Sequence, residues 1–429
     1  GSYFSASGIN KVLLNDGAVS TVTAPGTTSG VTYVAKGNRS ESITAGIGDD
    51  VFVFDGTGTL TGADTINGGA GTDTIQLDNT VDGGVTATLS LVDVTNVEKI
   101  TIKDPDGGDT AGSENADAIA ITFDADDGIY DDTDTTDETD GSVIIDASNI
   151  TDTNDTVEVT ATDVNDDDFS FTITTGAAID TIKSGDGPDT ITTNGSADVI
   201  EANGGADTVD AGDGDDSIDG GAGADTLTGG AGKDDFKYAL GGGASTQAKP
   251  DTITDFASGT DEIRISFTDP GNAGVTYDFT DKGSKSNVAE AIGLLSSKIG
   301  QYVFNTSTNT VLLDTDGNGL LQSGDLAITL TGVTALGEAD LAFDITTAGT
   351  ADTVTTGPGA DTVISAVAGD TITTGAGDDK VTINNGLTHT GAISMGAGTD
   401  ILNIDGDVTS TGAVTGVEKV TIKAAKTFS

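Results

Sequence analysis

The chain lacks cysteine and tryptophan, and its 429 residues include one histidine, one methionine and six prolines. Without cysteine, neither disulfide bonds nor thiolate metal sites can form. Only 4% of the residues are aromatic and 35% are hydrophobic, so a conventional hydrophobic core would be thin. No apolar run is long enough to span a bilayer, and the first residues lack the basic and apolar regions of a signal peptide. We therefore expect no transmembrane segment.

The scarcity of histidine also restricts the enzyme classes that the sequence could support. A zinc-protease helix with the H-E-x-x-H motif needs two histidines, and this chain has only His389. A Ser-His-Asp triad would have to use His389, and no G-x-S-x-G motif is present. Paired carboxylates of the glycosidase kind remain open, although few aromatic side chains are available to line a sugar cleft. We expect that the protein is not an enzyme and that His389 is an ordinary surface or strand residue.

Positive charge is scarce as well. Asp and Glu number 70 against 17 Lys and Arg, which gives a formal net charge of −53. Such like charge opposes compaction unless counter-ions neutralise it, and it repels nucleic acid, so we expect no nucleic-acid partner. A halophilic acidic surface is the alternative, but it would not place Asp at fixed intervals. The 62 glycines come with little proline and with many Val, Ile and Thr, which favours β-strands over collagen or disorder.

A nonapeptide period organises the middle of the chain. Residues 175–237 divide into seven consecutive windows, in which position six is always Asp, position eight is large and apolar, and positions two and four are mostly Gly. Windows of the same kind occur at 45–76 and 347–382, and one isolated copy spans 395–403. Repetition at a fixed short period predicts a solenoid.

The chemistry of the window predicts a calcium site. The glycine-rich half can turn tightly and lets backbone carbonyls converge, and the Asp adds a hard anionic oxygen of the kind that Ca²⁺ prefers. The other half is a short strand whose apolar side chain points inward. Two windows make one coil, so equivalent turns stack two windows apart, and Asp216 should lie one coil from Asp234. Seven windows would share about five ions.

The candidate calcium ligands in these windows are the aspartates at position six and the glycines of the most regular turns. They are Asp50, Asp64, Asp73, Asp180, Asp189, Asp207, Gly212, Gly214, Asp216, Gly221, Gly223, Asp225, Gly230, Gly232, Asp234, Asp352, Asp361, Asp370, Asp379 and Asp400. Sites are least expected where Ala178, Ser196, or Ala366 with Ala368 replace glycine. A metal-free solenoid with polar turns is the alternative, but it leaves unexplained why the turns carry Asp when so few basic partners are present.

The nonapeptide G-G-x-G-x-D-x-U-x, nearly complete in Gly220–Thr228, resembles the signature of the RTX family of secreted proteins. The resemblance covers the three arrays, about a third of the chain. It implies a parallel β-roll, folding induced by Ca²⁺ outside the cell, and export by type I secretion.

A separate calcium motif lies at 314–325. Its candidate ligands Asp314, Asp316, Asn318, Leu320 and Asp325 occupy positions 1, 3, 5, 7 and 12 of an EF-hand-type loop, with Gly319 at position 6. Asp instead of Glu stands at position 12, and strands instead of helices are expected on both sides. A polar hairpin loop is the alternative, and we favour Ca²⁺ binding.

We predict an all-β fold, a parallel β-roll or β-helix solenoid with a small helix-containing cap. Residues 251–265 resemble the segment that closes RTX rolls, and Ser286–Ile299 has apolar residues at helical spacing. The expected segments are an N-terminal β segment (1–44), a short array (45–78), a β-rich acidic insert (79–174), the main array (175–238), the cap region with the helix and the EF-hand-like loop (239–346), a third array (347–382) and a C-terminal β coil (383–429).

A second internal repeat lies outside the nonapeptides. The segments TNVEKITIKD at 95–104 and TGVEKVTIKA at 415–424 each follow a calcium-type turn. This arrangement resembles RTX-type bacterial surface-layer proteins, such as that of Caulobacter. It implies self-association into a lattice at the cell surface, with a surface polysaccharide as a possible anchor. An RTX adhesin segment and a non-catalytic module of an exported enzyme are the alternatives. The acidic tract at 124–140 is either a solvated loop or a place where Ca²⁺ bridges subunits.

Overall fold

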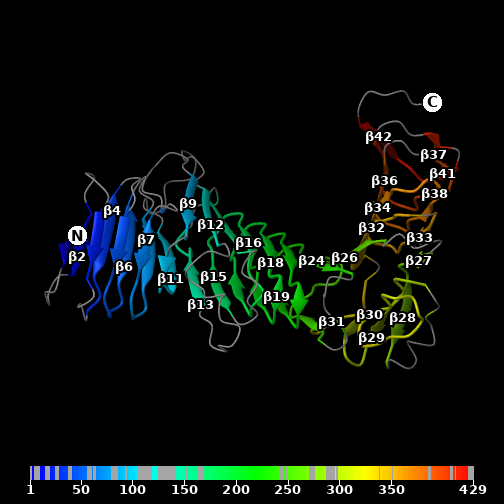
Figure 1. The fold of residues 1–429 in the computed structure, drawn as a ribbon. Coiled ribbons are helices and arrows are strands. Elements are labelled where there is room, and N and C mark those ends of the chain that lie inside the picture. The colour runs from blue at the N-terminus through cyan, green and yellow to red at the C-terminus, as the bar shows by residue number, and fades with distance from the viewer. Residues whose placement is uncertain are drawn as a thin grey trace. The chain divides into compact units, whose positions relative to one another are not determined.

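The computed structural model describes the regular part of the chain. The described residues are 2–3, 10–14, 20–24, 29–36, 41–55, 60, 64–78, 86–91, 94–103, 118–123, 142–150, 153, 155–161, 169–240, 246, 249–269, 276–286, 295, 298–337, 339–349, 351–384, 388–405, 409–410 and 412–423. Every regular element among them is a β-strand (Figure 1), which confirms the all-β prediction. None of these described residues forms a helix that could cross a membrane.

The chain divides into two compact units, Gly1–Gly220 with Gly229–Ala231, and Gly221–Thr228 with Gly232–Ser429. The first unit is a coil of short parallel strands that alternate between facing sheets. One sheet holds, in spatial order, β2 (Lys11–Leu13), β4 (Thr32–Lys36), β6 (Val51–Asp55), β8 (Thr74–Asp78), β11 (Lys99–Lys103), β13 (Ser142–Asp146), β15 (Ser170–Thr174), β17 (Thr190–Thr192) and β20 (Thr208–Asp210).

Two further sheets complete the coils of this unit. Early coils use β1 (Ser2–Tyr3), β3 (Ser20–Thr23), β5 (Glu41–Thr44), β7 (Thr65–Asn67) and β10 (Val94–Thr95). Later coils use β9 (Thr86–Ser90), β12 (Ala118–Thr122), β14 (Thr156–Thr160), β16 (Thr181–Lys183), β18 (Val199–Glu201) and β21 (Ser217–Asp219). The short β19 (Gly204–Gly205) lies in a turn of the main array, as does β22 (Ala222–Gly223) of the second unit.

The register of the main array follows the nonapeptide. Thr172 pairs with Thr190, and Thr190 pairs with Thr208, so each coil takes two windows, as the sequence predicts. Coils without the nonapeptide join the same sheet, because Lys99 of β11 pairs with Ile144 of β13. The solenoid thus continues through the described strands of the acidic insert.

The apolar residues at position eight form the core of the roll. Ile182, Ile191, Val209 and Ile218 are completely buried, as expected for the inward side of a strand. Burial of one such side chain contributes about 1.5–3 kcal/mol, so a ladder of them replaces the compact core that the composition disfavours.

The second unit also consists largely of parallel strands. One sheet holds β24 (Asp235–Ala239), β26 (Glu262–Thr268), β32 (Leu341–Thr346), β34 (Thr362–Ser365), β36 (Lys380–Ile383), β39 (Ile401–Asp405) and β42 (Lys419–Lys423). Another holds β27 (Thr276–Asp278), β33 (Thr353–Thr355), β35 (Thr371–Thr373), β38 (Ile393–Ser394) and β41 (Val414–Thr415), and β37 (Thr388–His389) pairs with β40 (Thr409–Ser410). Register steps of two windows recur here, as between Thr362 and Lys380.

A third sheet of this unit interrupts the parallel pattern. It holds β23 (Thr226–Thr228), β25 (Asp251–Ile253), β31 (Leu326–Leu330), β30 (Thr310–Leu313), β29 (Tyr302–Asn305) and β28 (Asp281–Lys285), and β30 runs antiparallel to both of its neighbours. Val303, Leu312 and Ala327 form a buried cluster on these strands. The connection between β30 and β31 carries the residues 314–325.

The described part of the cap region differs from the helix-containing cap that we predicted. Its elements are strands, because the β-branched and aromatic residues of β29 and β30 favour a pleated sheet. Most of the predicted helix at 286–299 lies outside the described residues. Of the described residues in that stretch, Leu295 packs against the apolar cluster beneath β29 and β30, and none is helical.

Candidate calcium sites

A ladder of hydrogen bonds joins the position-six aspartates of successive coils. The backbone N–H of Asp180 donates to Oδ1 of Asp198 over 2.7 Å, and the N–H of Asp198 donates to Oδ1 of Asp216 over the same distance. On the other row of turns, the N–H of Asp189 donates to Oδ1 of Asp207 at 2.7 Å. One oxygen of each carboxylate therefore fixes the turn one coil earlier.

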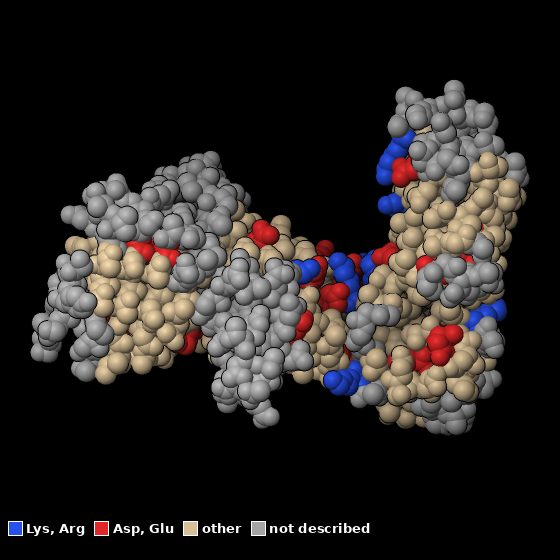
Figure 2. Space-filling view, viewed as in Figure 1, with Lys and Arg blue, Asp and Glu red and all other residues tan. Residues whose placement is uncertain are grey.

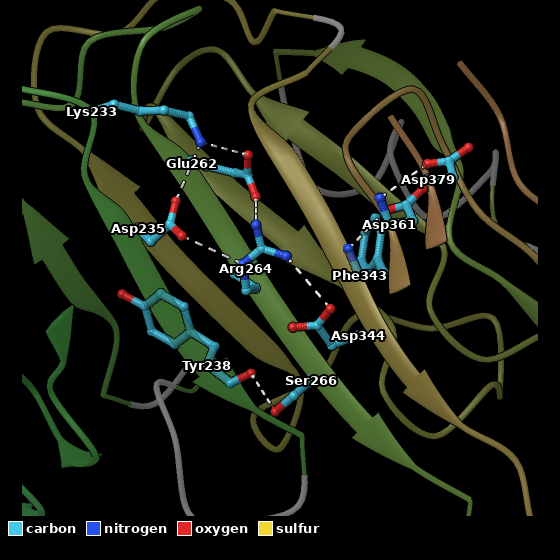
Figure 3. Close-up of polar contacts among 10 residues, drawn as sticks. All are labelled: Lys233, Asp235, Tyr238, Glu262, Arg264, Ser266, Phe343, Asp344, Asp361 and Asp379. Atoms are coloured by element: carbon cyan, nitrogen blue, oxygen red, sulfur yellow. Dashed lines mark hydrogen bonds and ion pairs between the residues drawn. The ribbon is translucent and has the colours of Figure 1, made fainter. Parts of the chain in front are cut away.

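The same ladder occurs in the other arrays. In Figure 3 the N–H of Phe343 donates to Oδ1 of Asp361 at 2.8 Å, and the N–H of Asp361 donates to Oδ1 of Asp379 at 3.0 Å. Further rungs join Glu41 to Asp64, Asp50 to Asp73, Asp352 to Asp370, and Asp379 to Asp400. The described position-six aspartates thus have a common backbone role in every array.

The second carboxylate oxygen has no such partner in many turns. The buried Oδ2 atom accepts no hydrogen bond in Asp73, Asp180, Asp189, Asp198, Asp361, Asp379 and Asp400. These side chains are at most 2% exposed. A buried anionic oxygen without a partner is costly, so each of these turns needs either a proton or a cation.

The pKa values of these carboxyl groups reflect that cost. Burial is the main cause that raises the pKa of Asp189 and of Asp198 to about 7, and the pKa of Asp361 to about 8. Burial likewise raises the pKa of Asp73 to about 6. Near neutral pH, a bound cation would replace the proton that burial favours.

In the part of the chain that the structure describes, no basic side chain supplies that cation. Among the described residues, no Lys or Arg forms an ion pair with Asp180, Asp189, Asp198, Asp361 or Asp379. In the view of Figure 2 red is sparse on the described surface, which agrees with the burial of array carboxylates.

Carboxylates elsewhere in the second unit do have cationic partners. Glu262 is only 5% exposed, but it pairs with Arg264 and, at 3.2 Å, with Nζ of Lys233 (Figure 3). Arg264 also reaches Asp235 at 3.6 Å and Asp344 at 3.5 Å, so it bridges three neighbouring strands. The comparison separates ordinary buried acids, which are paired, from those of the turns, which are not.

Glycine is required where the turns stack most closely. Gly212 has φ 97°, and a Cβ added there would lie 2.0 Å from the carbonyl oxygen of Asn194. A Cβ at Gly230, with φ 96°, would lie 1.8 Å from the carbonyl oxygen of Gly212. A Cβ at Gly214 would lie 2.0 Å from the carbonyl oxygen of Ser196 and 2.9 Å from Oδ1 of Asp216, so a stacked turn brings a backbone carbonyl oxygen close to a carboxylate. Carbonyl and carboxylate oxygens are the donor set that fits Ca²⁺.

The remaining predicted ligands of the main array fall at matching places. Gly214 stacks over the carbonyl of Ser196, and Gly221 and Gly232 have positive φ, while Gly223 belongs to β22. The ladder continues past the last window, because the N–H of Asp225 donates to Asp251 and that of Asp234 donates to Asp261.

The sequence analysis missed several ladder residues. Asp251 and Asp261 follow irregular spacings of 26 and 27 residues. Glu98 and Glu418 accept from the N–H groups of Asp73 and Asp400, so glutamate takes the aspartate role in each VEK segment. The repeated VEK segment is the sequence feature that could have identified Glu98 and Glu418 as ladder residues. Asp198, omitted from the predicted ligands, has the same ladder bond and the same partnerless Oδ2 as Asp180.

Two predicted ligands have both oxygens satisfied by the protein. Oδ2 of Asp370 accepts from the hydroxyls of Thr347 at 2.6 Å and Ser365 at 2.8 Å. Oδ2 of Asp50 accepts from the N–H of Gly46 at 3.2 Å. Asp370 is position six of the window in which Ala366 and Ala368 replace glycine, and the structure supports no need for an ion there.

The loop 314–325 gathers its acidic side chains between β30 and β31. One ligand atom each of Asp314, Asp316 and Asp325 lies within 4.8 Å of the others. Both oxygens of Asp314 accept backbone N–H groups, from Gly317 at 2.7 Å and Gly319 at 2.8 Å. The backbone N–H and the side-chain amide of Asn318 both donate hydrogen bonds to the carboxylate of Asp316, and the side chain of Leu320 is half exposed. The carboxylate and amide oxygens of these residues are suitable ligands for a calcium ion. The loop that holds them is already ordered by its own hydrogen bonds.

His389 is the last residue of β37 and is completely buried, so it is a strand residue and not a surface residue. Burial lowers the pKa of His389, which favours the neutral ring. The acidic tract at 124–140 lies outside the described residues.

These features define a class of protein, a parallel β-solenoid whose stacked turns present buried acidic oxygens suited to Ca²⁺. The model of the RTX calcium-binding nonapeptide repeat matches residues 59–82, 174–209, 201–236 and 346–381. The chain is therefore a protein with RTX repeats, which bind calcium. No curated protein matches it.

Proposed function

We propose that the chain is a secreted structural protein of the cell surface that folds and assembles when it binds Ca²⁺. The observation that carries this proposal is the set of buried Oδ2 atoms without a hydrogen-bond partner in Asp73, Asp361, Asp379 and Asp400. Calcium would neutralise these oxygens and add ligand bonds between neighbouring turns. The ligands would be the position-six carboxylates and the carbonyls of the glycine positions.

Ion binding would also control where the protein folds. Where Ca²⁺ is scarce, as in the cytosol, repulsion among the aspartates and the entropy of 62 glycines oppose folding. Outside the cell, an ion that binds only the folded turns stabilises them by mass action. This behaviour suits export of an unfolded chain by type I secretion.

Circular dichroism with and without Ca²⁺ tests the folding part of the proposal. In EDTA at pH 7.5 we expect a mainly disordered spectrum, and addition of Ca²⁺ should produce a β-sheet spectrum. Mg²⁺ should substitute poorly, because it requires a smaller octahedral site. An identical β spectrum in EDTA and in Ca²⁺ would reject the proposal.

The favoured biological role is a surface-layer lattice. The repeat arrays are distributed along the chain and alternate with other β coils, unlike a single terminal secretion module. The Glu98 and Glu418 rungs show that both VEK segments are built into the coil in the same way. Negative-stain microscopy in Ca²⁺ should show sheets, with or without an added surface polysaccharide. Dispersed particles at high concentration would favour an adhesin segment instead.

We also propose that the protein is not an enzyme. The burial of His389 supports this, because a ring with no exposed surface cannot reach a substrate. A hydrolase screen with ester, peptide and glycoside substrates should show no activity above background.

A further inference from the structure

The turns of the main array differ in the residues at positions one, two and four, and this difference changes from the first windows of the array to the later ones. In the first four turns, some side chains at positions one, two and four carry a hydroxyl or amide group, and the other residues at these positions are Gly or Ala. The polar ones are Thr175, Ser184, Thr193, Asn194, Ser196 and Asn203. In the later turns the same positions are held by Ala211, Gly212, Gly214, Gly229 and Gly230, which have no polar side chain. We call residues 175–203 the donor coils and residues 211–220 with 229–231, which belong to the same unit, the glycine coils.

Side chains of the donor coils bind carbonyl oxygens of the turn below. Nδ2 of Asn194 donates to the carbonyl of Thr175 at 2.6 Å, and Oγ of Ser196 donates to the carbonyl of Ala177 at 2.7 Å. The amide of Asn203 donates in the same way to the carbonyl of Ser184.

The backbone positions of these donors are those that glycine holds elsewhere. Asn194, Ser196 and Asn203 have φ of 70°, 77° and 61°, in the left-handed region. Asn is one of the few residues besides glycine that adopts this region readily. A side chain with hydrogen-bond donors thus projects into the space between turns where glycine would leave it open.

Hydroxyls at position one add bonds in the opposite direction. Those of Ser184 and Thr193 are completely buried and donate to the carbonyls of Ala202 at 3.2 Å and Ala211 at 3.0 Å. Between the turns that contain Gly212 and Gly230, contacts such as the N–H of Ala231 to the carbonyl of Gly212, at 2.8 Å, come from the backbone.

We infer that the amides and hydroxyl of Asn194, Ser196 and Asn203 take the place of calcium between the turns of the donor coils. They occupy carbonyl oxygens that an ion with six to eight oxygen ligands would need. The donor coils therefore bind Ca²⁺ more weakly than the glycine coils, and they keep local stacking in an ion-free chain that is otherwise mainly disordered. Calcium fills the glycine coils first, with the donor coils as an ordered template. This inference rests on the proposed calcium function.

Restoring glycine tests the inference with two effects of opposite sign. In the full chain, the double variant Asn194→Gly with Ser196→Gly, and separately Asn203→Gly, should each bind one Ca²⁺ about tenfold more tightly, since the freed carbonyls become ligands. In Ca²⁺-free buffer, amide hydrogens of residues 175–203 should exchange about tenfold faster in the variants than in the unmodified chain.

Asn96→Gly is a matched control. Asn96 also has positive φ, 52°, but its amide donates to the side chain of Asn67 and not to a carbonyl of the turn below. It should change neither readout. Weaker calcium binding in the Asn194 or Asn203 variants would mean that the asparagine is itself a ligand, and unchanged binding would mean that it does not compete. Either result overturns the inference, as does unprotected exchange of residues 175–203 in the ion-free unmodified chain. Absence of any calcium binding by the unmodified chain would instead reject the proposed function.

Discussion

The stacked turns and the loop 314–325 both concentrate aspartate, but they satisfy it in different ways. In the loop, Asp314 and Asp325 receive backbone N–H groups on both oxygens from residues within the loop. In the stacked turns, one oxygen of Asp198 or Asp361 reaches a neighbouring coil and the other has no hydrogen bond. A loop can complete its own hydrogen bonds, whereas a stacked turn depends on its neighbours and on an ion.

The largest expected effect is loss of a carboxylate from the glycine coils. Asp216→Ala removes an ion ligand and also the acceptor of the Asp198 N–H. Leaving a buried N–H unpaired costs about 1–3 kcal/mol, and the lost ion adds to that. We expect weaker Ca²⁺ binding by calorimetry and a lower free energy of unfolding in urea at saturating Ca²⁺, and Asp225→Ala should behave alike. Asp134→Ala, in the acidic tract, is the control, and an equal effect there would contradict the ladder.

A pH titration in Ca²⁺-free buffer tests whether the buried aspartates of the stacked turns carry protons when no ion is bound. Burial raises the pKa of Asp189 and Asp198 to about 7, above the usual value of about 4 in an unfolded chain. Between these values the folded form binds more protons, so the stability of the ion-free form must fall as pH rises. We expect more β signal by circular dichroism at pH 5 than at pH 7.5. The opposite trend would show that these carboxylates are stabilised as anions.

Protons should also compete with calcium. Because ligands must be deprotonated, the apparent Ca²⁺ affinity should fall as pH drops from 7.5 to 5.5, with proton release on binding. Calorimetry in buffers of different ionisation enthalpy measures that release. A binding enthalpy independent of the buffer would speak against burial of protonated carboxyls.

Asp361 and Asp370 offer a narrower comparison within one array. Asp361→Asn should remove one tightly bound ion, because Oδ2 of Asp361 accepts no hydrogen bond of good geometry, and the nearby Thr356 hydroxyl does not offset the burial that raises the Asp361 pKa. Asp370→Asn should leave the ion count unchanged, since hydroxyls of Thr347 and Ser365 already satisfy Oδ2 of Asp370. Mass spectrometry of the native protein counts the ions. Loss of an ion from the Asp370 variant would show that the hydrogen bonds from those hydroxyls do not replace an ion at Asp370.

The smallest effect is expected in the loop. Asp325→Ala removes a carboxylate that accepts from Thr315 and Gln322, so it should abolish Ca²⁺ binding at 314–325 and increase amide exchange there. Exchange of residues 175–238 should not change, because the loop closes its bonds locally. A chain-wide increase would show that the loop is needed for the roll.

The periodic part of the fold could be predicted from the sequence, because Asp at position six and an apolar residue at position eight fix one coil for every two windows. The coil through β11 and β13 could not, since Lys99 pairs with Ile144 across an irregular interval. The hydrogen bonds that satisfy Oδ2 of Asp370 come from the hydroxyls of Thr347, one coil away, and of Ser365. Such contacts arise from stacking and leave no motif. The antiparallel β29–β31 segment likewise interrupts a pattern that the repeats alone would continue.

The most direct test is a crystal structure of the protein grown in Ca²⁺, with anomalous scattering to locate the ions. We predict an ion about 2.3–2.6 Å from Oδ2 of Asp361, Asp379 and Asp400. Ordered turns in which these oxygens meet only water or a proton at neutral pH, with no ion between the coils, would contradict the account.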